Sequence, residues 1–269
     1  MEMGKSIVIT SGKGGVGKTT SSANIGTALA LMGKRVCLVD LDIGLRNLDV
    51  VLGLDNRIIY DIVDVVEGRA KLAQAIVKDK RFDDLLYLLP AAQNADKNAL
   101  TEEQAKQIID DLKPDFDYVL IDCPAGIEQG FLNAIAGADA AIIVTTPEIS
   151  AVRDADRIVG LLEKNPLREE SHLLINRIRS HMMADGDAMD VDEITHHLGV
   201  PLLGIIVDDD EVIATSNRGE PIVLETDNIA GRGYRDIARR LEGETVPLIK
   251  LEQPKTGFWS KVGHWFKRG

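Results

Sequence analysis

A glycine-rich segment with two lysines is the first feature of this sequence that can do chemistry. Residues 12–19 satisfy the pattern G-x-x-x-x-G-K-[ST] and lie between an apolar run and a segment with helical spacing. Because glycine lacks a Cβ atom, the backbone can turn its N–H groups around phosphate oxygens at a helix N-terminus. In this pattern Lys18 reaches the β- and γ-phosphates, and the Thr19 hydroxyl binds Mg²⁺. The predicted nucleotide contacts of the loop are Gly12, Lys13, Gly14, Gly15, Val16, Gly17, Lys18, Thr19 and Thr20.

Two aspartates follow apolar runs, at the strand ends where open α/β sheets bind ligands. Asp42 comes after the run 35–41, and Asp122 directly follows the run 118–121. Either residue alone could be a helix cap or a turn residue. Together with a phosphate loop they become candidates for magnesium chemistry, and we predict a Mg²⁺ site formed by Thr19, Asp42 and Asp122.

Lys13 is a second lysine, at a position that the phosphate-loop pattern leaves free. Lys18 already serves the phosphates. Lys13 is therefore either an ordinary surface cation or a group that reaches a nucleotide held by another subunit, as an arginine finger does. The residues alone leave both interpretations open.

The segment 176–179 follows another apolar run and is the candidate for base recognition. Asn176 could pair with a base or simply end a strand, and Arg177 lies next to it. A guanine-binding motif of the N-K-x-D type requires an acid where Arg179 stands. The sequence therefore favours adenine.

Apolar, β-branched runs alternate along the chain with segments of helical spacing, and these elements must position the groups above. The runs lack polar alternation, which is typical of strands buried on both faces. The alternation of strands and helices predicts an α/β fold of the P-loop NTPase type, with a mostly parallel, twisted sheet and helices on both faces. The predicted strands are 6–10, 35–41, 85–89, 118–121, 140–145, 173–175 and 202–207.

Composition indicates one folded body with a distinct C-terminal end. The 269 residues carry a net charge of −12, which disfavours a protein that coats nucleic acid or anionic lipid over its whole surface. No apolar run approaches the ~20 residues that cross a bilayer, and two cysteines are too few for a disulfide framework or a four-thiolate metal site. We expect a cytosolic protein with a P-loop domain at 1–245, a linker at 246–254 and a separate segment at 255–269.

The segment 255–269 has the composition of a helix that lies in a membrane surface. On a helix its apolar side chains form one stripe opposite a basic face without acids, and it is too short to span a bilayer. The alternatives are a helix docked on the domain's own surface and a partner groove of the calmodulin type. The net charge divides into +4 in this segment and −16 in residues 1–254. The predicted membrane contacts are Phe258, Trp259, Val262, Trp265, Phe266, Lys261, Lys267 and Arg268.

These motifs together resemble a known family. The loop 13–20, with its extra lysine, resembles the deviant Walker A motif of the MinD/ParA group of P-loop ATPases. One departure is the segment 207–210, where the family usually has a proline near the adenine. Further strings extend the resemblance over essentially the whole chain, and they resemble the branch of the family that acts in bacterial division-site placement. These strings are 42–49, 122–128, 146–156 and 216–221.

The resemblance implies roles for the matching positions. Lys13 would cross a nucleotide-sandwich homodimer to the phosphates of the partner subunit. Asp42 would position the attacking water, and Asp122 would hold Mg²⁺ through water. The implied catalytic residues are Lys13, Lys18 and Asp42. The implied first-switch, dimer and partner-binding residues are Arg46, Asn47, Glu148 and Asp154.

The sequence and the resemblance together predict an ATP- and Mg²⁺-dependent switch ATPase. It would dimerise with ATP and attach through 255–269 to the anionic cytoplasmic face of the inner membrane. The implied partners are a MinC-like inhibitor of septation and a MinE-like or other topological regulator, with no specific nucleic acid. The rival functions are a ParA-like DNA-partition ATPase, which the acidic body disfavours, an iron–sulfur reductase, which needs cluster thiolates, and a nucleotide-binding scaffold without turnover.

Overall fold

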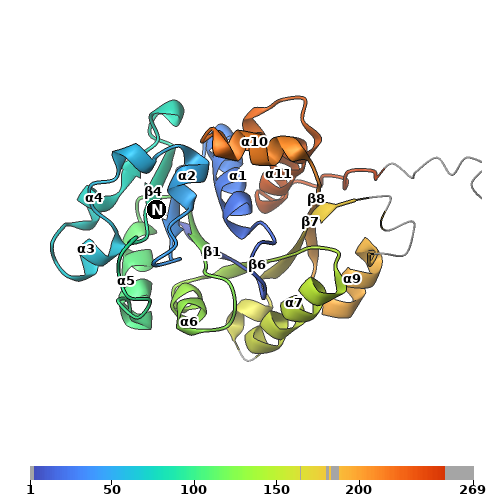
Figure 1. Ribbon diagram of the computed structural model, residues 1–269, viewed down its shortest axis with the longest axis horizontal. Coiled ribbons are helices and arrows are strands. Elements are labelled where there is room, and N and C mark those ends of the chain that lie inside the picture. The colour runs from blue at the N-terminus through green and yellow to red at the C-terminus, as the bar shows by residue number, and fades with distance from the viewer. Residues whose placement is uncertain (1–2, 164, 180–181, 183–187, 252–269) are drawn as a thin grey trace, which may run out of the picture.

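The computed structural model describes residues 3–163, 165–179, 182 and 188–251, which form one eight-stranded sheet between two layers of helices (Figure 1). The strand order is β3-β4-β2-β5-β1-β6-β7-β8. Neighbouring strands pair in parallel, except that β3 is antiparallel to β4. The strands are β1 (Lys5–Thr10), β2 (Val36–Asp40), β3 (Val77–Lys78), β4 (Leu86–Leu89), β5 (Tyr118–Asp122), β6 (Ala140–Thr145), β7 (Ser171–Ile178) and β8 (Leu202–Val207).

The helices divide between the two faces of the sheet. Side chains of β1 alternate between the layers, with Val8 in one core and Ile7 and Ile9 in the other. Helices α1, α2 and α11 pack on the face of Ile7, whereas α5, α6, α7 and α9 cover the face of Val8 (Figure 1). The α-helices are α1 (Lys18–Leu31), α2 (Leu48–Leu52), α3 (Ile62–Val66), α4 (Leu72–Ala75), α5 (Glu102–Leu112), α6 (Gln129–Ala136), α7 (Ile149–Leu162), α9 (Val191–Leu198), α10 (Asp210–Asn217) and α11 (Ile229–Leu241). The 3-10 helices are η1 (Asp55–Arg57), η2 (Lys80–Phe82), η3 (Pro166–Arg168) and η4 (Ile222–Leu224).

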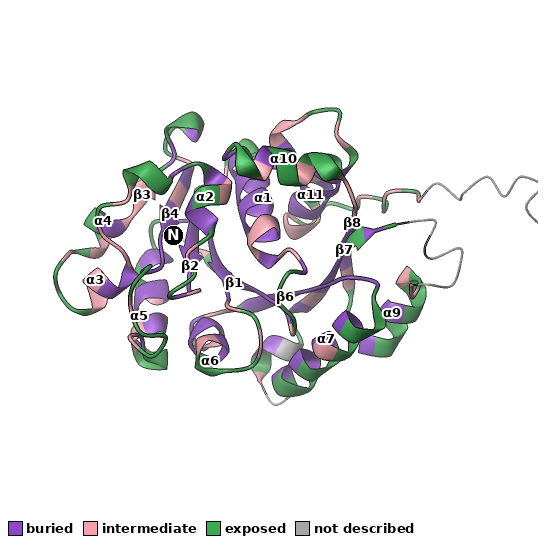
Figure 2. Cartoon of the chain, viewed as in Figure 1, coloured by how far each residue is buried: buried purple, intermediate pink, exposed green. Residues whose placement is uncertain are grey.

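Local sequence explains why these elements form. Every residue of the central strands β2, β5 and β6 is buried, as their uninterrupted apolar runs predict (Figure 2). Helix α5 begins with a capping box, in which Thr101 accepts from the Gln104 N–H and the Gln104 side chain accepts from the Thr101 N–H. Its four apolar positions at helical spacing are buried. The pattern of burial therefore follows the periodicity of the sequence.

The predicted fold class is confirmed, and every predicted strand overlaps an observed one. Strand β7 extends beyond the predicted run 173–175 at both ends, because Ser171 and His172 pair with β6 and Ile178 pairs with β8. Strand β3 was not predicted. It is two residues long and pairs antiparallel at the edge of the sheet, so no periodic pattern could reveal it.

The parallel register gathers three loops at one edge of the sheet. Ile9 pairs with Asp122 across β1 and β5, and Asp40 pairs with the same Asp122 across β2 and β5. The loops that leave β1, β2 and β5 therefore start side by side. These are the loops that carry the phosphate-binding pattern and the two predicted aspartates.

The C-terminal part of the described chain stays on the body. After α11, the described residues 246–249 contact α11 through Arg240 and Gly233, so the predicted linker at 246–254 begins in contact with the domain. The segment 255–269 and its predicted membrane contacts lie outside the described residues. None of the described helices has the length and apolarity that crossing a membrane requires.

Candidate nucleotide site

The phosphate loop leads from β1 into α1 through residues in unusual backbone conformations. Gly17, with φ of +96°, precedes the first turn of α1 without a side-chain cap. A Cβ atom on Gly17 would lie 2.2 Å from Nδ2 of Asn176, which donates a 2.8 Å hydrogen bond to the Val16 carbonyl. Only glycine fits this position, both for its φ and for its space. The first N–H groups of α1 thus lie at a helix N-terminus, which favours an anion.

One side of the loop packs against α7. A Cβ atom on Gly12 would lie 2.0 Å from the backbone oxygen of Asp154. The exposed Lys13 donates a 3.1 Å hydrogen bond from Nζ to the Ser150 hydroxyl, in the first turn of the same helix. The structure therefore brings Lys13 next to α7, where Glu148 is the exposed N-cap residue and Asp154 is half-buried.

Asp122, the last residue of β5, lies beside the first turn of α1, where a magnesium site next to the phosphate loop would be. The Thr19 hydroxyl donates to Oδ2 of Asp122 at 2.7 Å, and the Ser22 hydroxyl donates to Oδ1 at 2.8 Å. Burial raises the pKa of Asp122 to about 6, although the charge of Lys18 and both hydroxyl hydrogen bonds favour the ionised form. Lys18 is itself buried. Thr19 and Asp122 thus form one cluster of oxygen donors beside a buried cation, and hard oxygen ligands of this kind suit Mg²⁺.

Asp40 is a residue of the site to which the sequence analysis assigned no role. It is buried at the end of β2, where it accepts hydrogen bonds from the N–H groups of Asp42 at 2.9 Å and Leu48 at 3.4 Å. Burial and the neighbouring charge of Asp122 raise the pKa of Asp40 to about 8. Asp40 therefore holds both ends of the loop that carries Asp42. The sequence did carry a signal for this residue: Asp40 is an acid at the end of an apolar strand, two positions before Asp42.

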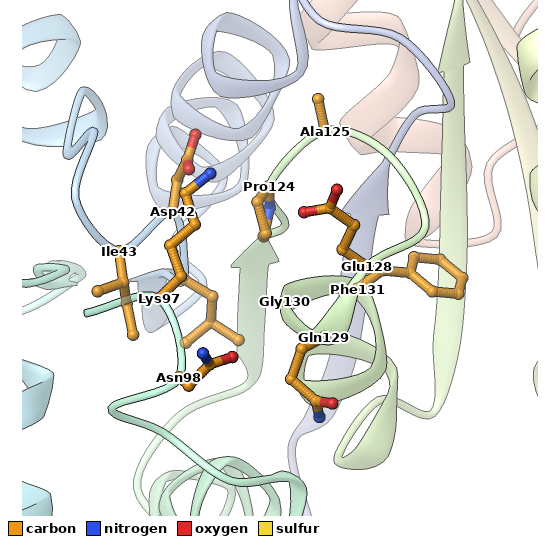
Figure 3. A pocket seen from close by; sticks show the side chains of 11 residues that line it. Asp42, Ile43, Lys97, Asn98, Pro124, Ala125, Glu128, Gln129, Gly130 and Phe131 are labelled. Carbon is orange, nitrogen blue, oxygen red and sulfur yellow. The ribbon is translucent and has the colours of Figure 1, made fainter.

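Asp42 lines a cavity of about 270 Å³ between the loop after β2 and the start of α6, with both polar and apolar walls. Burial raises the pKa of the half-buried Asp42, while the charges of Lys18 and Lys97 lower it. Figure 3 shows the Lys97 ammonium and the Asp42 carboxylate at the same end of this cavity, with Glu128 across from them. The structure thus places Asp42 near Lys18, but in the loop beside the phosphate-loop cluster rather than within it.

The predicted first switch follows Asp42. Arg46 is half-buried and its Nε lies 2.8 Å from Oδ2 of the buried Asp49, while Asn47 is the exposed N-cap residue of α2. Burial raises the pKa of Asp49, and the charge of Arg46 opposes this shift. In this structure Arg46 therefore pairs with the first turn of α2, and Asn47 is exposed.

The base-recognition candidates lie at the end of β7. Asn176 is buried, and besides binding the Val16 carbonyl it accepts a 2.9 Å hydrogen bond from the Arg177 N–H. Arg177 has a positive φ of 54°. Arg179 forms a 2.6 Å ion pair with Asp208, at the end of β8. The amide of Asn176 thus supports the phosphate loop directly, a contact that the sequence analysis did not anticipate.

The parallel sheet with its phosphate loop, second lysine and strand-end aspartates defines a P-loop ATPase of the deviant Walker A type. A family model described as an AAA domain matches residues 4–175. The chain is 66% identical to the septum site-determining protein MinD of Bacillus subtilis, over 98% of each chain. It is 46% identical to MinD of Escherichia coli K12, over 97% of this chain and 99% of that protein. The chain belongs to the MinD family of septum site-determining proteins.

Solved structures agree with this assignment. The MinD cell division protein of Aquifex aeolicus superposes with a TM-score of 0.84 at 47% identity, covering 91% of this chain and all of the other. MinD in the MinC:MinD complex of the same organism superposes with a TM-score of 0.84 at 48% identity, over 91% of this chain and 98% of the other. MinD of Pyrococcus horikoshii, solved with Mg-ADP, superposes with a TM-score of 0.81 at 32% identity, over 89% of this chain and 96% of the other. Membership of this family means that the protein acts in the placement of the division site.

Proposed function

We propose that this protein is a Mg²⁺-dependent ATP hydrolase that acts as a dimerisation switch. The observation that carries the proposal is the cluster of Thr19 and Asp122 beside the buried Lys18 at the N-terminus of α1. The backbone N–H groups and Lys18 would bind the β- and γ-phosphates, and Thr19 and Asp122 would hold Mg²⁺. When bound, Mg²⁺ neutralises the charge that develops on the transferred phosphoryl group.

The hydrolytic step that we propose is in-line attack of water on the γ-phosphate. Asp42 orients the attacking water, which requires the loop after β2 to close toward the phosphates. Lys13 crosses the dimer to the phosphates of the partner subunit. Because the Lys13 side chain is exposed and its Nζ is hydrogen-bonded to Ser150 alone among the described residues, moving this side chain away costs about 1 kcal/mol or less.

Adenine is the base that we propose. In an N-K-x-D guanine site the fourth residue is an acid, whereas here it is Arg179, which pairs with Asp208. Asn176 and Arg177 lie next to the phosphate loop through the hydrogen bond to Val16. We propose that they form the base-side wall of the nucleotide site.

We further propose reversible attachment to the cytoplasmic face of the inner membrane through 255–269. One such segment is marginal, since each buried apolar side chain gives roughly 1.5–3 kcal/mol and ordering the backbone costs about 1–2 kcal/mol per residue. Two segments on one ATP dimer bind as a bivalent unit, which raises apparent affinity by about 10²–10⁴. Dimerisation with ATP would therefore attach the protein to the membrane, and hydrolysis of ATP would release it.

The division-site role requires partners. The Aquifex complex contains MinD with MinC, and we propose that this chain likewise binds a MinC-like inhibitor, together with a MinE-like or other topological regulator. The proposed surface contains Asn47 and Arg46 of the first switch and Glu148 and Asp154 of α7. Asn47 and Glu148 are exposed, as this role requires.

Co-sedimentation with anionic vesicles tests the switch. The full chain with ATP should sediment, the same chain with ADP should stay largely in the supernatant, and a chain lacking 255–269 should not sediment with either nucleotide. Equal binding with ADP, or full binding after the deletion, contradicts the proposal. A salt-sensitive, ATP-dependent gel shift with DNA would instead support the ParA-like alternative.

A further inference from the structure

Arg240 holds the C-terminal segment 246–251 to the body of the protein. Its guanidinium, in the last turn of α11, donates three hydrogen bonds to backbone carbonyls: Nη1 to Leu203 at 2.9 Å, Nε to Val246 at 3.0 Å and Nη2 to Pro247 at 2.9 Å. One side chain thus connects α11, strand β8 and the chain that leaves the domain.

This arrangement depends on the shape of the arginine side chain. The planar guanidinium presents several N–H donors in fixed directions, so it can bind three carbonyls at once. The half-buried Arg240 lies over Gly204 of β8, where a Cβ atom would meet Nη1 at 3.2 Å and Cγ1 of Ile237 at 2.5 Å. The missing side chain at Gly204 therefore lets α11 and its arginine approach β8.

Packing continues the attachment beyond the hydrogen bonds. A Cβ atom on Gly233 of α11 would lie 3.5 Å from Cδ1 of Ile249, so Ile249 contacts the α11 side of the sheet. The half-buried Leu251 packs against the core on the opposite face, as does Leu202 of β8. The segment therefore passes around the open edge of β8, and contact with the body extends to residue 251.

We propose that Arg240 is a positioning residue for membrane attachment, because it fixes the point from which the membrane-binding segment 255–269 leaves the domain. This inference rests on the proposed membrane attachment. With 246–251 held, three residues, 252–254, connect the body to that segment; with 246–251 released, nine residues do so. Effective concentration falls as about the −3/2 power of tether length, so a threefold longer tether weakens bivalent binding about fivefold.

Substitution of Arg240 tests the proposal in the full-length protein. Arg240→Gln should weaken ATP-dependent binding to vesicles of phosphatidylethanolamine and phosphatidylglycerol by up to about fivefold, the loss expected when 246–251 is released completely. It should also speed trypsin cleavage after the exposed Lys250. Hydrolysis of ATP without vesicles should stay unchanged. Arg232→Gln is the matched control, since it removes an exposed arginine of the same helix, and it should bind as the unsubstituted protein does.

A second variant tests the tether without touching the body. Six Gly/Ser residues inserted after Leu251 lengthen the connection from three residues to nine and should produce the same loss of about fivefold. Unchanged vesicle binding by this variant overturns the inference, even if Arg240→Gln fails to fold. So does Arg240→Gln with faster cleavage after Lys250 but unchanged vesicle binding. Failure of the full chain to bind vesicles, or binding that survives deletion of 255–269, would instead refute membrane attachment itself.

Discussion

The Thr19 hydroxyl donates a 2.7 Å hydrogen bond to Asp122, although 103 positions separate the two residues in the chain. The contact exists because β5 pairs with β1, so that the last residue of β5 lies beside the loop into α1. A hydroxyl has one proton and two lone pairs. Since its proton points to Asp122, the lone pairs of Thr19 remain available to a metal ion, and the buried acid orients this ligand in advance.

Asp122→Asn should abolish hydrolysis and yet stabilise the nucleotide-free, metal-free protein. Burial holds the pKa of Asp122 at about 6, above its unfolded value of about 3.9, so the ionised form opposes folding. Asparagine has nearly the same shape, and both hydroxyl partners can reorient. We expect a gain of about 1–3 kcal/mol, or several degrees in Tm by calorimetry in EDTA.

The pH dependence of this gain identifies its cause. The wild-type carboxyl favours folding below about pH 4, and this contribution is lost as the pH rises through about 6. The two proteins should therefore have similar Tm values below about pH 4. The difference should grow as the pH rises through about 6, and again through about 8, where Asp40 ionises beside the charge of Asp122 in the wild type. A constant difference across this range contradicts the titration argument.

Gly12→Ala should destabilise the fold, because its Cβ atom would lie 2.0 Å from the backbone oxygen of Asp154. Overpacking against a backbone atom costs about 1–3 kcal/mol, or roughly 3–10 °C in Tm. Gly14→Ala is the control, since its nearest neighbour, the Ala125 Cβ, is 3.9 Å away, and its unfolding free energy should change by less than about 0.5 kcal/mol. Equal Tm values for the two variants would show that the loop does not pack on α7 in solution.

Lys13→Gln should lower kcat for ATP hydrolysis by about 10³, the smaller end of the effect of an arginine finger. The thermal stability and the ATP affinity of the monomer should stay within error, because Lys13 is exposed and its Nζ contacts Ser150. Phosphate release under saturating ATP and isothermal titration measure the two effects separately. Phosphate release at the wild-type rate would favour a nucleotide-binding scaffold without turnover.

The thiols of Cys37 and Cys123 should react with Ellman's reagent only after unfolding. Both are free and buried, and burial raises the pKa of Cys123 to about 12 and that of Cys37 further. At pH 8 we expect full reaction in guanidinium and less than about a tenth of it in native buffer over the same time. Rapid native reaction, or iron in the purified protein, would reopen the iron–sulfur alternative.

The sequence by itself determined the strands, the layers and the phosphate loop, because these depend on local signals. Strands buried on both faces are uninterrupted apolar runs, and a glycine-rich turn before a helix specifies its own backbone geometry. Asp42 and Asp122 were found for the same reason, since each follows a run that marks a strand end. Strand β3, two residues long, carried no such signal.

Only the tertiary structure decided which of these groups meet. The order of strands in the sheet is not encoded in any local pattern, and it is this order that places Asp122 beside Asp40 and Thr19. The same holds for the amide of Asn176 under Val16. Tertiary structure also decides the contacts of Arg240. Because α11 packs on the sheet beside β8, this side chain binds carbonyls of two segments, β8 and 246–247. Contacts between residues far apart in the chain depend on how complete elements pack.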